Sequence, residues 1–416
     1  MFTSFSTALS ALNAHTTAID VVGNNLANLN TAGFKASSVA FYDLVTQSLG
    51  AGLGETQVGF GVGTPVTLRQ FSQGAIQSTG GPLDASIQGD GFFVLRNSSN
   101  ATLYTRGGHF VVDKDGNLNT ASGQRLQGWT QTNGVLDTNL PVGDIKVPVG
   151  SLKKPIATTK FSVDLNLNAA ATAGPPPDQF STSIQVFDSL GNSHDVTVAF
   201  TKNSTANTWD YTLSFPPADL ASTTTTTPVT GTLQFDSNGQ LISPAATDPA
   251  PVLNANSLLD GASDMAIKWD IFNGSTPRIT QFSQPSATSA LSQDGSAAAN
   301  LVRVGLGDGG KILAQYSNGQ QVVVGQVAMA TVRNPASLIS VGNSNYQLSA
   351  RSALPAIGLP DTGGRGSVLG GTVEASTVDI AKQFTNLIVY QRGYQANTRM
   401  VTTVDEISQE TINLKR

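Results

Sequence analysis

Residues 7–35 read TALSALNAHTTAIDVVGNNLANLNTAGFK, and this stretch decides how the chain begins. Apolar positions recur at spacings of three and four, which is the period of one face of an α-helix. The stripe predicts a helix about 42 Å long at about 1.5 Å per residue. The run from Asn28 to Phe34 ends it, with Gly33 as a left-handed stop. The stripe consists of Phe2, Phe5, Leu9, Leu12, Thr16, Ile19, Val22, Leu26 and Leu29.

The C-terminal end repeats the pattern from a start near Glu374. Both stripes are narrow, closer to the seam of a coiled coil than to the broad apolar face of a core helix. We therefore expect long helices at both termini that form a coiled-coil-like terminal domain. The second stripe consists of Ile380, Phe384, Leu387, Gln391, Tyr394, Thr398, Val401, Val404, Ile407, Thr411 and Leu414.

Between the two ends the sequence is typical of strands and turns. The chain has 416 residues, enough for two or three domains, and contains 42 Gly and 19 Pro. Turn signals separate short apolar runs, so the predicted fold class is mainly β and multi-domain, with long α-helical termini. The turn signals are Gln73-Gly74, Asp90-Gly91, Asp115-Gly116, Ser237-Asn238-Gly239, Gln293-Asp294-Gly295 and Asn318-Gly319.

Two shifts in composition, at 148–155 and at 276–285, predict domain boundaries. Residues 50–63 are rich in glycine and read as a flexible or extended connector. The predicted parts are a terminal helical domain of 1–33 and 372–416, a glycine-rich connector of 34–70, an inner β domain of 71–147 and 282–371, and an inserted outer β domain of 148–281.

The composition excludes several classes of function. A net charge of −5 argues against nucleic-acid binding, which needs a basic face. Cysteine is absent, which removes disulfides, thiolate catalysis and Cys-ligated metals. No apolar run approaches the roughly 20 residues of a membrane span, and the opening segment has no charged region of a signal peptide before Lys35. If the protein is exported, we expect a route without a cleaved signal peptide.

Three motifs look like chemistry but read better as turns or loops. Residues 305–310 fit GxGxxG, but the segment after them reads as a strand instead of the helix that a dinucleotide site needs. Residues 113–117 begin like a calcium loop, but Leu118 and Gln124 stand where Gly and Glu are required, so a hairpin turn is expected, with a weak surface calcium contact left open. Ser151 and Lys154 fit SxxK, but Pro155 disfavours the helix that would join them.

The histidines give no site either. His15, His109 and His194 stand in different regions without ligand spacing, and each is interpreted as a polar surface or turn residue. No carboxylate pair stands out. We therefore expect no catalytic residue, no cofactor and no metal, and a protein that is not an enzyme.

The residues at the end of the first helix form the pattern NNxANxNTxGFK, which resembles the opening of the bacterial flagellar rod and hook axial proteins. The C-terminal segments 374–380 and 391–397 are similar to the same family, as are internal blocks at 71–84, 91–93, 104–106, 126–129, 293–295, 316–320 and 325–328. The motif residues are Asn24, Asn25, Asn28, Thr31, Gly33, Phe34, Lys35, Tyr394, Gln395 and Asn397. Gly393 departs from the family pattern and should soften the helix by about 1 kcal/mol.

The resemblance implies a structural subunit of the bacterial flagellum. The inserted segment around 186–195 favours the curved, flexible hook, a universal joint that transmits torque, over the straight rod. The implied partners are further copies in a helical homopolymer, the flagellar rod, hook cap and hook-filament junction proteins, and the export apparatus, with no nucleic acid and no membrane insertion. The implied location is extracellular. A distal rod protein and a secreted β-rich adhesin or enzyme remain as alternatives.

The terminal stripes predict a self-assembly seam. Narrow apolar stripes do not by themselves offset the entropy of ordering two long helices, so we expect the termini to order when neighbouring subunits cover them. The predicted seam residues are Phe5, Leu9, Leu12, Ile19, Val22, Leu26, Ile380, Phe384, Leu387, Tyr394, Val401, Val404 and Ile407.

Overall fold

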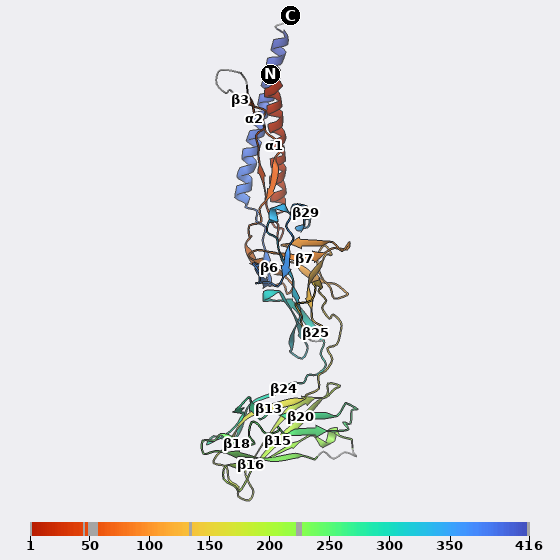
Figure 1. Cartoon of the computed structure of the whole chain (residues 1–416), viewed down its shortest axis with the longest axis vertical. Coiled ribbons are helices and arrows are strands. Elements are labelled where there is room, and N and C mark those ends of the chain that lie inside the picture. The colour runs from red at the N-terminus through yellow and green to blue at the C-terminus, as the bar shows by residue number, and fades with distance from the viewer. Residues whose placement is uncertain (1, 45, 49–56, 133–134, 222–226, 414–416) are drawn as a thin grey trace. The chain divides into compact units, whose positions relative to one another are not determined.

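The structure, a computed structural model, describes residues 2–44, 46–48, 57–132, 135–221 and 227–413 (Figure 1). The chain divides into two compact units. Unit 1 comprises Met1–Val149, Arg303–Gln315 and Gln321–Arg416, and unit 2 comprises Gly150–Val302 and Tyr316–Gln320. Both units are rich in strands, and the two long helices lie at the chain ends in unit 1, so the prediction of a mostly β, multi-domain protein with helical termini is confirmed.

The two terminal helices are α1 (Phe2–Ala27) and α2 (Ile380–Asn413), and they lie side by side (Figure 1). Helix α2 begins at Ile380, whereas the sequence predicted a start near Glu374. Thr372–Glu374 is a strand, and the Asp379 carboxylate accepts the N–H of Lys382 in the first turn of the helix. The buried apolar positions of α1 are Ala8, Ala14, Ala18 and Val22, and the polar Asn25 is buried with them. Only Val22 belongs to the predicted stripe, which consisted mainly of large apolar residues and omitted the alanines.

The segment 34–70 forms two antiparallel strand pairs where the structure describes it. β1 (Ser37–Ala40) pairs with β4 (Val66–Arg69), and β2 (Thr46–Ser48) pairs with β3 (Gln57–Gly59). The N–H of Val62 donates to Ser10 Oγ of α1 at 3.2 Å, so this hairpin lies against the first helix. Residues 49–56, the glycine-rich centre of the predicted connector, lie outside the described residues.

Thirteen strands of the described chain form the main sheet of unit 1, and it combines residues from distant parts of the sequence. β7 pairs with β28, and β11 pairs with β27, all antiparallel. The main-sheet strands are β7 (Phe92–Arg96), β8 (Thr102–Thr105), β9 (Phe110–Val112), β10 (Leu118–Thr120), β11 (Arg125–Thr130), β12 (Gly143–Asp144), β25 (Leu301–Leu306), β26 (Lys311–Tyr316), β27 (Gln321–Val327), β28 (Met329–Thr331), β29 (Ile339–Gly342), β30 (Asn345–Gln347) and β31 (Ala356–Gly358).

Two short strand pairs complete unit 1 next to the helices. β5 (Ile76–Ser78) pairs with β33 (Thr372–Glu374), and β6 (Ala85–Gln88) pairs with β32 (Ser367–Gly370). Both pairs join an early segment of the chain to the segment just before α2. The short 3₁₀ turn η3 (Pro335–Ser337) precedes β29.

Unit 2 contains two five-stranded sheets whose inner side chains form one apolar core. Strand β15 alternates buried and less buried residues along most of its length, as a strand with one face on a core must. The first sheet contains β13 (Lys160–Asn168), β19 (Val252–Ala255), β20 (Met265–Trp269), β23 (Ile279–Phe282) and β24 (Ala287–Gln293). The second contains β14 (Gln179–Phe187), β15 (Ser193–Lys202), β16 (Thr208–Ser214), β17 (Val229–Phe235) and β18 (Leu241–Ser243). The remaining elements are η1 (Pro217–Asp219) and the small pair β21 (Phe272–Asn273) and β22 (Thr276–Pro277).

Two of the three motifs interpreted as turns or loops connect neighbouring strands, and the third, Ser151 to Lys154, is extended, with Lys153 in a bridge to Ala299. The GxGxxG segment is the connection between β25 and β26, with the short 3₁₀ turn η2 (Asp308–Gly310) in it. The Asp113 carboxylate accepts the backbone N–H groups of Asp115 and Asn117 in the hairpin between β9 and β10. Hydrogen bonds, from the Asn117 side chain first, lower the pKa of Asp113 to about 2. Both predictions of a hairpin are confirmed.

The interpretation of His194 as a surface or turn residue is wrong. His194 lies in β15 with 6% of its surface exposed, and its two ring nitrogens face Asp219 and Asp188. The spacing within the sequence does not reveal this, because Asp219 reaches the ring from a separate turn. His15 is likewise no turn residue, since it lies within α1.

Within the described residues, neither helix combines the length and the apolar character that crossing a membrane requires.

Replacing Phe161 by Ala should destabilise unit 2. Phe161 is 1% exposed and stacks on Trp269 with ring centroids 6.2 Å apart. We expect a loss of about 3–5 kcal/mol, because the removed ring leaves a cavity. Urea denaturation followed by tryptophan fluorescence measures it, since Trp209 and Trp269 belong to this unit. Leu259→Ala, at a side chain that is 68% exposed, is the control and should change little. An unchanged midpoint for Phe161→Ala would contradict the core described here.

Candidate functional site: the junction of the two chain ends

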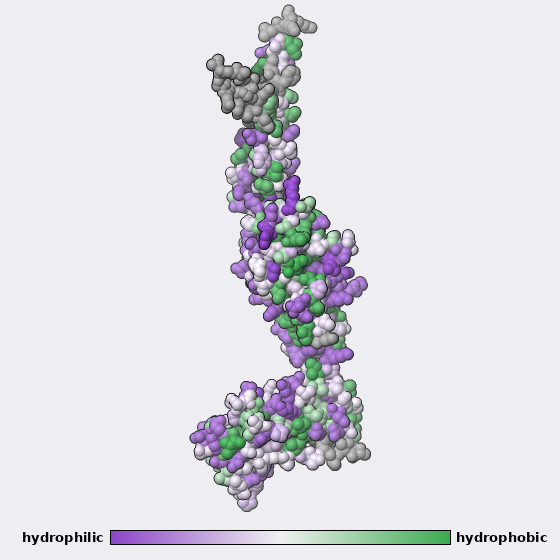
Figure 2. Space-filling model, in the orientation of Figure 1, coloured by the Kyte–Doolittle hydropathy of each residue, from purple (hydrophilic) through white to green (hydrophobic). Residues whose placement is uncertain are grey.

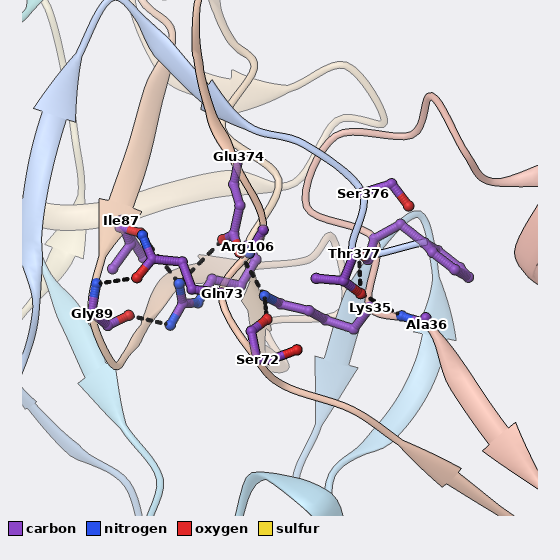
Figure 3. Close-up of polar contacts among 12 residues, drawn as sticks. Lys35, Ala36, Ser72, Gln73, Ile87, Gly89, Arg106, Glu374, Ser376 and Thr377 are labelled. Carbon is purple, nitrogen blue, oxygen red and sulfur yellow. Dashed lines mark hydrogen bonds and ion pairs between the residues drawn. The ribbon is translucent and has the colours of Figure 1, made fainter. Parts of the chain in front are cut away.

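A buried ion pair joins the segment after α1 to the segment before α2. Lys35 and Glu374 are both 0% exposed, and Lys35 Nζ lies 2.6 Å from Glu374 Oε1 (Figure 3). The same ammonium donates to the carbonyl of Ser72 at 2.6 Å. Lys35 is the last residue of the NNxANxNTxGFK motif, so the motif delivers the cation of this pair.

Arg106 brings a second cation to the same carboxylate. Its Nη1 donates to Glu374 Oε2 at 3.1 Å, and its Nη2 donates to the carbonyl of Gly89 at 2.7 Å (Figure 3). The N–H of Gly74 donates to Glu374 Oε1 at 2.7 Å. One buried carboxylate therefore holds three separate parts of the chain.

The neighbouring charges of this site shift the pKa of Lys35 in opposite directions. Burial is the largest effect and lowers the pKa of Lys35, because it penalises the charged ammonium. The charge and hydrogen bond of Glu374 raise that pKa, and the charge of Arg106 lowers it. A buried pair of this kind contributes little net stability, but the loss of one partner leaves an uncompensated buried charge.

Backbone hydrogen bonds run alongside the ion pair. The N–H of Gly33 donates to the carbonyl of Glu374 at 2.8 Å, and the N–H of Thr377 donates to the carbonyl of Phe34 at 3.1 Å. The N–H of Ala36 donates to Thr377 Oγ1 at 2.8 Å (Figure 3). Gly33 has a φ of +68°, and a Cβ there would overlap the backbone of Arg106. Glycine is required here both by the left-handed backbone and by the close approach.

Asn25 extends the junction into the helices. Its side chain is fully buried and exchanges two hydrogen bonds with the backbone of Ser37, at 2.7 and 3.0 Å. Its Nδ2 also lies 3.2 Å from Oε1 of Gln383 in α2. One amide therefore connects α1, β1 and α2, and all of these partners are polar groups that would otherwise be buried without bonds.

The other motif residues do not join this cluster. Asn28 Nδ2 donates to the carbonyl of Asn24, and Thr31 Oγ1 donates to Asn28 Oδ1, so these three close the end of α1. Asn397 Nδ2 donates to the carbonyl of Gly393 inside α2. Tyr394 is 39% exposed. Gln395 Oε1 accepts a long hydrogen bond from Arg392 Nη1, at 3.4 Å.

The predicted seam residues divide by exposure. Val22 is buried, and Leu12, Ile19, Leu26, Leu387, Val401 and Val404 are half-buried. The exposed members are Phe5, Leu9, Ile380, Phe384, Tyr394 and Ile407. The structure thus brings the first group into the helix pair and leaves the second group facing outward.

Gly393 has a local explanation that the sequence did not suggest. A Cβ at this position would approach the ring of His15 to 2.6 Å, so the missing side chain makes room for that ring. The ring of His15 also lies 5.6 Å from Phe41 and 6.3 Å from Tyr390, centroid to centroid. Burial lowers the pKa of His15. The bulky ring of His15 on α1 therefore packs where Gly393 on α2 has no side chain.

Sequence reasoning found Lys35 but missed its partners. Glu374 and Arg106 stood only as members of similar segments, and Asn25 only as a motif residue. A lysine needs an acidic partner only when it is buried, and the sequence did not show that Lys35 is buried.

Four family models match the chain along its length, and they define the class of protein as an axial protein of the flagellum. They are described as Flagella basal body rod protein (residues 5–35), Flagellar hook protein FlgE/F/G D1 domain (86–166), Flagellar basal body protein FlaE D2 domain (166–296) and Flagellar basal body rod FlgEFG protein C-terminal (369–414). The two terminal models include the residues of the junction on either side.

Relatives that match over their full length identify one family within this class. The flagellar hook proteins FlgE of Escherichia coli (strain K12) and Treponema pallidum (strain Nichols) are each 32% identical to this chain, over 99% and 100% of it and all of their own length. The chain belongs to the flagellar hook protein family. The crystal structure of the Helicobacter pylori flagellar hook protein FlgE2 shares the fold, with a TM-score of 0.52 at 13% identity, over 70% of this chain and 99% of that one.

Replacing Lys35 by Met should destabilise unit 1 by about 3–5 kcal/mol, because Glu374 and the Ser72 carbonyl lose a buried donor. Guanidinium denaturation of the full-length chain measures the change. Lys114→Met is the matched control, because the Lys114 side chain is 87% exposed in its pair with Asp115. The control should leave the midpoint unchanged. Equal losses of stability for the two variants would mean that burial of the Lys35–Glu374 pair does not increase its contribution to folding.

Proposed function

We propose that this chain is the structural subunit of a bacterial flagellar hook and polymerises through its terminal helices into a curved, flexible tube. The tube acts as a universal joint that transmits torque from rod to filament. Membership in the hook protein family over the full length supports this role. The observation that carries the mechanism is the row of large apolar side chains that the paired helices leave in contact with solvent.

These exposed side chains lie on both helices. Phe5 and Leu9 of α1 are 41% and 47% exposed, and Phe384 of α2 is 51% exposed. Figure 2 shows hydrophobic residues among the polar ones on the surface of this helical part. Large apolar side chains that stay exposed on both helices offer area for an interaction with another molecule. A second copy of the same chain is the partner that a homopolymer requires, and a head-to-tail contact that does not close produces a helical assembly.

The helix pair itself is coiled-coil-like in this proposal. Small residues of α1, such as Ala14 and Ala18, allow close approach, and less exposed residues of α2 recur every seven positions at Gln383, Tyr390 and Asn397. The pair is held at its base by the Lys35–Glu374 junction. Large side chains thus remain free for neighbouring subunits.

The domain layers follow the four-part division predicted from the sequence. The terminal helices (1–33 and 372–416) line the tube, the segment 34–70 connects them to an inner β domain (71–147 and 282–371), and the insert (148–281) lies outermost. Polar surfaces with few ion pairs allow the outer parts of neighbouring subunits to slide. The proposed partners are the rod, hook cap and hook-filament junction proteins, and the export apparatus, and the proposed location is outside the cell.

Phe384→Asp should abolish polymerisation while the monomer stays folded. A carboxylate at an apolar subunit contact must be desolvated without a partner, which is costly. Electron microscopy of purified protein under polymerising conditions, with circular dichroism of the monomer, measures both properties. Thr385→Asp, at the exposed neighbouring position, places the same charge on another face of α2 and should still polymerise. Normal polymer from the Phe384→Asp variant would show that Phe384 does not belong to the self-assembly seam.

Deleting the insert should leave polymerisation intact and change curvature. The deletion removes residues 150–300, which belong to unit 2 and end before β25, and a domain joined at exposed positions such as Gly150 and Asn300 can be removed with its neighbours intact. We expect cells carrying the deletion to form straight or irregularly curved hooks and to swim poorly, as seen by electron microscopy and motility assays. Absence of any polymer from an exported, folded deletion variant would place the insert among the assembling parts.

A further inference from the structure

A cluster of charged side chains lies in unit 2 and shares no residue with the junction. The ring of His194 is held between two carboxylates: Nδ1 is 2.7 Å from Asp219 Oδ2, and Nε2 is 3.2 Å from Asp188 Oδ2. His194 is 6% exposed, Asp188 is 0% exposed, and the Asp219 side chain is 34% exposed. The ring also packs on Phe215, with centroids 5.1 Å apart.

The geometry leaves His194 one satisfactory protonation state. A neutral imidazole has one N–H, so one of its two nitrogens would direct a lone pair at a carboxylate oxygen. The doubly protonated ring donates to both carboxylates. Asp260 adds a third acidic group, since one of its carboxylate oxygens lies within 4.8 Å of a carboxylate oxygen of Asp188 and a ring nitrogen of His194. Among the described residues no Lys or Arg forms an ion pair with these three aspartates, so the ring is their local positive charge.

The cluster connects three loops. Asp188 Oδ1 accepts the N–H groups of Leu190, Gly191 and Asn192 and so closes the turn between β14 and β15. Asp219 ends η1, and its carbonyl accepts the N–H of Leu259 at 2.9 Å.

The third loop contains Asp260, which accepts the Asn192 amide at 2.8 Å. The N–H of Ser263 in the same loop donates to Ser189 Oγ at 2.9 Å. The imidazole therefore lies where the turn at 188–192, the 3₁₀ turn at 217–219 and the loop at 258–263 meet.

We propose that His194 is an imidazolium at neutral pH, and that this single charge clamps the three loops and makes their closure depend on pH. The clamp is a property of unit 2 and stands whether or not the proposed function is right.

The pH range in which the clamp is closed follows from the pKa shifts of His194 and Asp188. Burial alone would lower the pKa of His194, but the hydrogen bonds and charges of Asp219 and Asp188 raise it. The clamp is therefore complete below the ordinary histidine value of about 6.5 and is lost as pH rises through the higher folded value. Burial would raise the pKa of Asp188, but hydrogen bonds with Asp260, His194 and the backbone lower it to about 2. The contribution of charged Asp188 to the stability of the cluster is present above the ordinary carboxyl pKa and is lost as pH falls toward about 2.

Nitrogen-15 NMR of the full-length chain, labelled at histidine only, tests the protonation state directly. The chain has 3 histidines, so His15→Gln, His109→Gln and His194→Gln assign the three rings. We expect both nitrogens of His194 to carry protons at pH 7, and the His15 ring to be neutral. Asp219→Asn should move the His194 titration to lower pH, whereas Asp210→Asn, a carboxylate of the same unit outside the cluster, should not.

Hydrogen exchange tests the clamp itself. After correction for intrinsic rates, amides of 188–192, 217–221 and 258–263 should lose protection between pH 6 and pH 9 in the unmodified chain, and His194→Gln should be poorly protected at both. A singly protonated His194 ring at pH 7, or loop protection that does not change with pH, overturns the proposal. So does stoichiometric binding of added Zn²⁺ at the His194 ring, because the positive charge of the cluster would then be a metal ion.

Discussion

The carboxylate of Glu374 is the constraint on which the rest of unit 1 depends. It accepts hydrogen bonds from Lys35, Arg106 and the N–H of Gly74 in a place without solvent exposure. A buried charge tolerates few arrangements, since each unmatched group costs free energy. The two helices therefore leave the β region at one fixed point, although apolar side chains such as Leu9 and Phe384 stay exposed on their outer faces.

Local periodicity and turn chemistry were sufficient to predict the main elements. Spacings of three and four placed both helices, and Asp-Gly pairs marked hairpins such as that at Asp115-Gly116. Partners far apart in sequence were beyond such reasoning: Lys35 and Glu374 are separated by 339 positions. The buried face of α1 was missed because its contacts use alanines, which a count of large apolar side chains overlooks. The clamp at His194 was missed because burial, which gives a histidine its partners, is not visible in spacing.

Small residues carry more of this structure than large ones at the helix pair. Ala14 and Ala18 are almost completely buried, and Gly393 admits the ring of His15. Close packing of these small residues fixes how the two helices fit, together with half-buried side chains such as Leu12 and Leu387. The same chain therefore has an internal contact that is selective for shape and an external surface that is rich in apolar area.

The position of Glu374 in the sequence also sets when the junction forms. A chain that emerges from its N-terminus presents Lys35 and Arg106 early, but their common anion arrives only with the last tenth of the residues. Until then two cations lack the partner that permits their burial, and the segment after α1 has no reason to leave water. Contacts of such long sequence separation form late. A subunit interrupted before residue 374 would lack both this carboxylate and α2, so Lys35 and Arg106 would have no common anion and α1 no anchor.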